Sequence, residues 1–260
     1  YKKILADTIT PVSIYLKIRD KYPNSILLES SDYHANDNTF SYICFNPIAT
    51  IKVENETIFQ TFPDGSETSK LITKTTDVSE EINQFTKRFK VNSEEEFKFI
   101  NNGIFGYIAY DAVRYFEDVE ISKKENSVSI PDVNYAVYKN IIAINHHKNE
   151  AYIFAHCFNS EPNIEEIDHL IKVKNFASYN FSSKGTLTSN LTDDEYKKHV
   201  ELAKKHCGRG DVFQLVLSKS FAQEFKGDEF NVYRALRSIN PSPYLFYFDY
   251  GNFKIFGNSY

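Results

Sequence analysis

The 260-residue sequence contains no methionine and no tryptophan, and it has only three cysteines. Cys44, Cys157 and Cys207 are odd in number and far apart. This excludes a disulfide framework and a metal knuckle built from neighbouring cysteines. So few cysteines predict a protein of the reducing cytoplasm.

Long apolar runs are also missing. No stretch approaches the roughly 20 consecutive apolar residues that a membrane-spanning helix needs. Asp7 interrupts any apolar signal-peptide segment at the start. The 30 basic and 35 acidic residues give a formal net charge of −5, which argues against a nucleic-acid surface. We therefore expect neither a membrane nor a nucleic acid as a partner.

Apolar and aromatic residues are abundant, at 42% and 15% of the chain, which is enough for a large core.

The sequence marks two helix starts clearly. Thr10 followed by Pro11 is typical of a helix N-terminus. Thr192 with Glu195 forms a capping box, and we expect Gly208 to end that helix.

Strand signals come in pairs. Residues 136–157 and 244–256 are predicted to form hairpins, and 40–45 and 49–53 two strands around a proline. Hairpins with interspersed helices predict an α+β fold with antiparallel β-sheets flanked by helices. The Ser/Thr-rich residues 181–190 are predicted to be a linker, which divides the chain into residues 1–180 and 191–260.

Gln214 lies inside the apolar run 212–217, which predicts a buried central strand over residues 212–221. A buried amide must find a hydrogen-bonding partner. Two interpretations stay open: a core glutamine bonded to neighbouring backbone, or an amide that orients a polar ligand or a water.

Glu29 and Ser30 follow a short apolar strand at the start of a polar loop. A carboxylate there can receive an ammonium group, and the hydroxyl beside it can bond a carboxylate or an amide. The alternative is a solvated loop edge.

A second candidate is the corner at residues 240–244, which contains Pro241, Pro243 and Tyr244. These residues offer a stiff apolar wall for a flat ring, bound with a small ordering penalty. The alternative is a helix stop followed by a turn. His199 and His206, seven residues apart, are too distant to hold one metal without other ligands, so no metal site is predicted in this chain.

Four segments in order resemble the component I family of anthranilate synthases, among the chorismate-utilising enzymes. They are LLES at 27–30, GYIAYDAVRYFE at 106–117, GDVFQLVLS at 210–218 and NPSPYLF at 240–246. The resemblance implies conversion of chorismate and ammonia to anthranilate and pyruvate in tryptophan biosynthesis. It also implies magnesium, a glutamine amidotransferase partner that supplies ammonia, and feedback inhibition by tryptophan.

The resemblance further implies a role for each matching residue. Tryptophan would be bound by Leu28, Glu29, Ser30, Asn240, Pro241, Ser242, Pro243, Tyr244 and Leu245. Gln214 would lie beside chorismate as a positioning group, because an amide is neither an acid nor a base. Near Phe40 the family often has a basic residue, so one carboxylate contact differs here.

The family's magnesium ligands and its main catalytic residues are expected beyond residue 260. Residues 1–180 are thus predicted to be a tryptophan-sensing region and 191–260 the start of a chorismate-binding catalytic domain, with no activity in this chain alone. Two alternatives stay open. One is component I of aminodeoxychorismate synthase, in the folate pathway, and the other is a stand-alone amino-acid-sensing module.

Overall fold

The computed structural model describes residues 1–30, 39–92, 95–121 and 129–259. The chain divides into two compact units, the first made of Tyr1–Ala177 with Ala235–Tyr260 and the second of Ser178–Arg234. This division differs from the predicted one, in which residues 191–260 formed one region. The physical reason is strand pairing, because residues 244–249 return to pair with residues 26–30.

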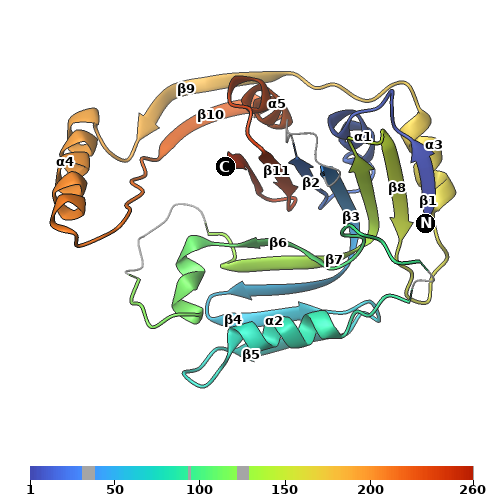
Figure 1. Cartoon of the computed structure of the whole chain (residues 1–260), viewed down its shortest axis with the longest axis horizontal. Coiled ribbons are helices and arrows are strands. Elements are labelled where there is room, and N and C mark those ends of the chain that lie inside the picture. Colours follow the sequence, from blue (N-terminus) through green and yellow to red (C-terminus); the bar gives the residue numbers. More distant parts are fainter. Residues whose placement is uncertain (31–38, 93–94, 122–128, 260) are drawn as a thin grey trace. The chain divides into compact units, whose positions relative to one another are not determined.

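The first unit is built on an antiparallel sheet that has ten strands among the described residues (Figure 1). The sheet order is β1-β8-β7-β3-β2-β11-β12, with β4 also paired to β3, β5 to β4 and β6 to β7. The antiparallel sheet and its covering helices confirm the predicted fold class. The strands are β1 (Lys2–Leu5), β2 (Ile26–Ser30), β3 (Phe40–Glu54), β4 (Thr57–Thr61), β5 (Glu67–Leu71), β6 (Ile104–Ile108), β7 (Val133–Asn145), β8 (Glu150–Ala155), β11 (Tyr244–Asp249) and β12 (Lys254–Ser259).

The long strands β3 and β7 form the middle of this sheet, and both bend along their length (Figure 1). The two strands predicted at 40–45 and 49–53 are therefore one strand. Pro47 has no N–H to donate, and the pairing is irregular between Pro47 and Ala49, with Asn46 at a φ of 61°. A local irregularity replaces the predicted break, because both flanking segments keep β7 as their partner.

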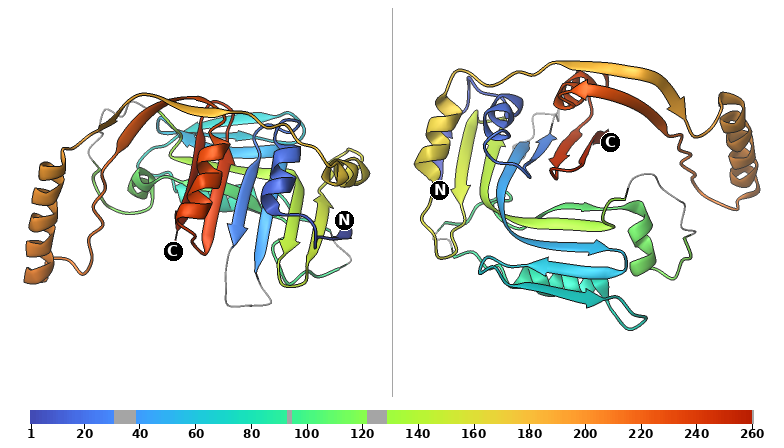
Figure 2. Two further views of the ribbon diagram at one scale, coloured as in Figure 1. Left: turned by 90° about the horizontal axis from the view of Figure 1, so that it is seen from above. Right: turned by 180° about the vertical axis from the view of Figure 1, so that it is seen from behind.

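Helices cover the outside of the sheet. They are α1 (Pro11–Ile18), α2 (Val78–Lys87), α3 (Ile164–Lys172) and the short 3₁₀ helix η1 (Tyr110–Tyr115). The predicted start of α1 is confirmed, since the Thr10 hydroxyl accepts from Ser13 N at 3.1 Å and Ser13 Oγ accepts from Thr10 N at 3.0 Å. α1 lies over β2 and β3 (Figure 2).

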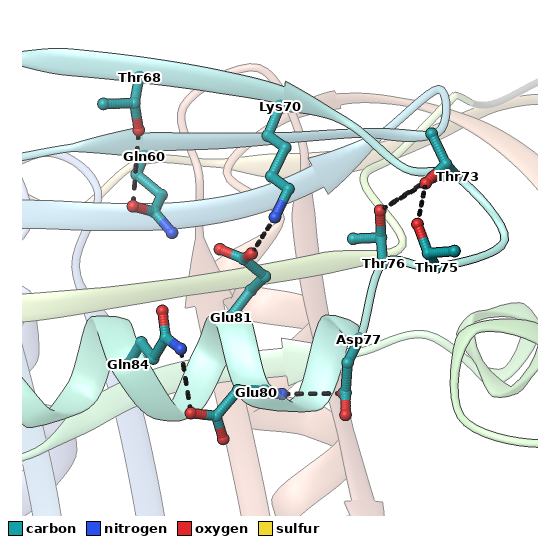
Figure 3. A network of polar contacts seen from close by, with 10 residues as sticks. All are labelled: Gln60, Thr68, Lys70, Thr73, Thr75, Thr76, Asp77, Glu80, Glu81 and Gln84. Carbon is teal, nitrogen blue, oxygen red and sulfur yellow. Dashed lines mark hydrogen bonds and ion pairs between the residues drawn. The ribbon is translucent and has the colours of Figure 1, made fainter.

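Polar contacts at its first turns hold α2 in place (Figure 3). The Asp77 carboxylate caps the helix by accepting from Glu80 N at 3.0 Å, and Lys70 of β5 pairs with Glu81 at 2.5 Å. On its other side α2 buries Val78 and Phe85 in a cluster with residues of β3 and β4. The helix thus covers the end of the sheet to which β4 and β5 belong.

The second unit consists of β9 (Phe181–Ser189), α4 (Asp193–Arg209), β10 (Phe221–Gly227) and the first half of α5 (Phe230–Ile239). The predicted linker is wrong, because residues 181–189 form a strand paired with β10. The strand predicted over 212–221 is also wrong, since strand structure begins only at Phe221. The capping box of α4 is confirmed, but the helix ends at Gly210, in the left-handed conformation, and not at Gly208.

None of the helices in the described residues is long and apolar enough to cross a bilayer.

Candidate functional site

The predicted ligand-binding segments meet where β2 pairs with β11. Tyr244 lies opposite Ser30, Leu245 opposite Glu29 and Phe246 opposite Leu28. We call Leu28, Glu29, Ser30, Tyr244 and Leu245 the β2–β11 junction. Two segments from opposite ends of the chain are thereby neighbours in one sheet, within the first unit (Figure 2).

The strand pleat divides the junction between two faces, because directly opposite residues share a face and successive residues alternate. Tyr247 packs edge-on against Tyr15 of α1 at 5.6 Å, so its alternate neighbour Leu245, together with Glu29, lies on the helix face. Leu28, Ser30 and Tyr244 lie on the other face, which we call the cavity face. The burial agrees with this division, since Leu245 is 4% exposed and Tyr244 62%.

Glu29 and the Pro243–Tyr244 corner were predicted to enclose one ligand, and this stays a prediction. Glu29, Tyr244 and Leu245 are all among the residues that line one cavity. The pleat places the side chains of Tyr244 and Leu245 on different faces of the sheet, because it reverses at each residue.

The cavity face borders a cavity of about 1470 Å³. Its lining is mainly apolar and comes from β2, β3, β6, β11 and β12. Phe40 is one of the lining residues and stacks on Phe99, with ring centroids 4.6 Å apart.

An ion pair holds the Glu29 carboxylate on the helix face. Arg237, in the half of α5 that belongs to the first unit, donates from Nη2 to Glu29 Oε1 at 2.9 Å. Ser41 Oγ accepts from the backbone N–H of Ser30 at 3.2 Å and lies 2.7 Å from His146 Nε2. These contacts fix both the carboxylate of Glu29 and the strand that carries it. Arg237 was not predicted, because nothing local in the sequence links it to Glu29.

The corner before β11 is held by hydrogen bonds of its own. Asn240 N donates to Leu236 O at 2.9 Å, and Asn240 O accepts from Asn258 Nδ2 at 2.8 Å. Ser242 is buried, and its hydroxyl donates to the carbonyl groups of Ser259 and Tyr244. Pro241 is exposed and Pro243 half-buried. The helix-stop interpretation thus describes Asn240 and Ser242 well, and Pro243 remains available to contact a ligand.

Gln214 lies in the second unit, and its side chain is exposed. Its neighbour Phe213 is fully exposed and Val216 is 83% exposed, so the run that predicted a buried strand is neither buried nor a strand. Apolar periodicity shows that a segment favours burial but does not show what covers it. The place of Gln214 beside chorismate stays a prediction.

A polar network anchors the segment 106–117, another carrier of the resemblance. Arg114 Nη2 contacts Asp132 Oδ2 at 2.6 Å, and the Tyr115 hydroxyl donates to the same oxygen at 3.0 Å. Burial and the hydrogen bond to Asp132 raise the pKa of Tyr115. The network ties η1 to the residue that precedes β7. Sequence reasoning did not identify it, because Asp132 lies outside the motif.

In the part of the chain that the structure describes, no three His, Cys, Asp or Glu side chains are arranged so that they could hold a metal ion.

The sequence of this chain is similar to that of a known enzyme family. Residues 24–260 match the family described as chorismate binding enzyme. The chain is 29% identical over 276 residues to anthranilate synthase component 1 of Aquifex aeolicus, covering 100% of this chain and 54% of that protein. The Lactococcus lactis protein of the same name is 30% identical, with 99% and 56% covered.

A solved structure supports the fold. Anthranilate synthase component I from Streptococcus pneumoniae superimposes with a TM-score of 0.61 at 23% identity, covering 100% of this chain and 57% of that one. The chain therefore spans about half the length of the curated relatives it matches.

Proposed function

The chain belongs to the chorismate-binding enzyme family, and from this premise we propose that it is the N-terminal part of component I of an anthranilate synthase. The whole protein would convert chorismate and ammonia to anthranilate and pyruvate, in the cytoplasm, with ammonia supplied by a glutamine amidotransferase partner. The proposal is supported by relatives that carry this name and align along the whole of this chain.

The regulatory part of the proposal is a tryptophan site at the β2–β11 junction. The observation that carries it is the pairing of Leu245 with Glu29, which joins two segments of the resemblance into one place. Glu29 offers a buried carboxylate for the ligand's ammonium group. Leu245 shares its face, and Pro243 lies at the entrance to β11, so these two residues provide the apolar wall for the indole ring.

Inhibition from this site requires that tryptophan prefer a conformation of low activity, because a ligand with equal affinity for two states shifts neither. The junction suits such a role. β11 is bonded to β2 on one side and to β12 on the other, and it follows α5, which begins in the second unit. A ligand that moves β11 therefore acts on a strand that is joined through α5 to the chain of the second unit.

Within the catalytic half of the proposal, Gln214 would position chorismate without taking or giving a proton. Magnesium, when bound, neutralises charge on its substrate's oxygens. We assign no residue of this chain to the metal, because the described residues contain no suitable cluster. The 260 residues by themselves are expected to be inactive.

The activity is tested with the full-length protein supplied with chorismate, magnesium and ammonium. Release of anthranilate and pyruvate in equal amounts supports the proposal. An aminated product that keeps the pyruvyl moiety would identify an aminodeoxychorismate synthase instead. The same assay on the 260-residue chain is expected to give no product.

The sensor is tested by tryptophan inhibition of the full-length variants Glu29→Ala and Pro243→Ala. Both are expected to weaken inhibition by about tenfold or more, the loss of one charge-assisted contact or one well-packed wall, while uninhibited turnover stays near the parent value. Glu67→Ala on the exposed strand β5 and Pro162→Ala before α3 serve as matched controls. Unchanged inhibition in both junction variants would refute the assignment.

A further inference from the structure

The carboxylate assigned to the ligand's ammonium group already has a cation beside it. Besides the Nη2 hydrogen bond at 2.9 Å, Nε of Arg237 lies 2.8 Å from Oε2 of Glu29. Nε makes no hydrogen bond there, so only one arm of the guanidinium is aligned with the carboxylate. The pair thus lacks the two parallel hydrogen bonds of an ideal arginine–carboxylate fork.

The two partners differ in their access to water. The side chain of Glu29 is 4% exposed, whereas that of Arg237 is 37% exposed. Glu29 is also fixed within a strand that is bonded on both sides, to β3 and to β11. Arg237 stands on a long flexible side chain near the C-terminal end of α5. The pair can therefore open only by movement of the arginine.

Opening without a replacement is costly, because it takes a close cation away from a buried carboxylate. An ammonium group that arrives from solvent removes this cost by taking the place of the guanidinium. The displaced guanidinium then stands beside the newcomer with its hydrogen-bond donors unused. A carboxylate attached one carbon away from the ammonium group is the group that those donors would bind.

We infer that Arg237 determines the specificity of this site: it holds the ammonium position of Glu29 when the site is empty and binds the α-carboxylate of the amino acid that displaces it. The inference rests on the proposed tryptophan site and adds a residue and a selection rule to it. A free α-amino acid with an aromatic side chain satisfies both charges. An aromatic amine loses the arginine contact without compensation, and an aromatic acid offers Glu29 no cation.

The test measures binding of three probes to the full-length protein by calorimetry. The probes are L-tryptophan, tryptamine, which lacks the carboxylate, and indole-3-propionate, which lacks the ammonium group. The parent protein is expected to prefer tryptophan to each of the others by about tenfold or more, the value of one charge-assisted contact. Arg237→Gln is expected to bind tryptophan about tenfold more weakly and tryptamine more tightly, because Glu29 has lost its internal competitor.

Arg234→Gln is the matched control, one turn earlier in α5, where Arg234 donates to Asn231 Oδ1 at 3.0 Å. It is expected to leave the preference for tryptophan over tryptamine unchanged. The double variant Glu29→Gln with Arg237→Gln removes both charges and is expected to bind all three probes weakly, with little preference among them.

The outcomes distinguish failure of the Arg237 role from failure of the proposed tryptophan site. If the parent binds tryptophan and Arg237→Gln keeps the same preference over tryptamine, the role of Arg237 is overturned and the sensor stands. If an active parent enzyme does not bind tryptophan, the sensor itself is overturned. Should Arg237→Gln fail to fold, Arg237→Lys keeps the cation without the planar fork. It is expected to show a reduced preference, and a full parental preference would contradict the inference.

Discussion

Leu245 on β11 lies directly opposite Glu29 on β2, and the two side chains share the helix face of the sheet. The next pair in the ladder, Tyr244 and Ser30, belongs to the cavity face. A shift of one residue along β11 therefore changes the face of the sheet on which a side chain lies, although Glu29, Tyr244 and Leu245 all line one cavity.

This register predicts different effects for two neighbouring substitutions. Leu245→Ala is expected to weaken tryptophan inhibition of the full-length enzyme by about tenfold or more, because burial of a leucine side chain is worth roughly 1.5–3 kcal/mol. Tyr244→Ala is expected to change inhibition much less, because its ring is largely exposed on the cavity face. The measurement is the tryptophan concentration that halves anthranilate formation. Equal losses in the two variants would contradict the assignment of faces.

Gly106 on β6 predicts a stability effect. A Cβ atom at this position would lie 1.9 Å from the carbonyl oxygen of Asn134 on β7, and Gly106 has a φ of 158°. Gly106→Ala must separate β6 from β7 and is expected to lower the free energy of unfolding by about 1–3 kcal/mol, as for overpacking in general.

Gly208→Ala provides the comparison for that experiment. Gly208 lies within α4 and has no atom within 4 Å of an added Cβ. Alanine there is expected to stabilise the helix by roughly 0.5–1 kcal/mol. Urea unfolding followed by circular dichroism measures both changes. A Gly106→Ala protein as stable as its parent would show that β6 can move away without loss.

The Arg114–Asp132–Tyr115 network predicts coupling between its members. Asp132→Ala removes the carboxylate that both other side chains contact, and it is expected to cost about 1–3 kcal/mol by leaving partly buried donors without an acceptor. Tyr115→Phe removes one hydrogen bond and is expected to cost about 1 kcal/mol. In a double-mutant cycle the two losses should be less than additive. Strict additivity in urea unfolding would indicate that the hydrogen bond contributes nothing.

His156 predicts how stability depends on pH. Its ring stacks on Phe154, and burial lowers the pKa of His156 below its ordinary value. The folded protein therefore keeps this imidazole neutral in a range where the unfolded chain takes up a proton, which begins near a pH of about 6.5. The folded state is therefore not penalised by His156 above a pH of about 6.5. The free energy of unfolding falls as the pH drops from there through the lower pKa that His156 has in the folded protein.

The check is the free energy of unfolding of the full-length protein between neutral and mildly acidic pH. The parent is expected to lose more stability on acidification than His156→Gln, which cannot be protonated. His199→Gln, at an exposed position of α4, is expected to follow the parent. Parallel curves for the parent and His156→Gln would contradict the prediction.

Features that depend on neighbouring residues were predicted well. The starts of α1 and α4 follow from Thr10 and Thr192, whose hydroxyl groups accept hydrogen bonds from amides three residues later. The hairpins around 146–149 and 250–252 follow from apolar runs on either side of a short polar turn. Each of these involves groups within a few residues of one another, so their energetics are contained in a short stretch of sequence.

Tertiary structure decided the rest. The sequence placed Glu29, Tyr244 and Leu245 in one family site, but only the β2–β11 register shows which of these side chains share a face of the sheet. Only the packing of α5 brings Arg237 to Glu29, a partner 208 residues away in the chain. Residues 181–189 were likewise predicted to belong to a linker, and only their pairing with β10 shows that they form a strand. The composition and local pattern of a segment determine what it favours, whereas its face and its partners depend on strand pairing and packing between residues far apart in the chain.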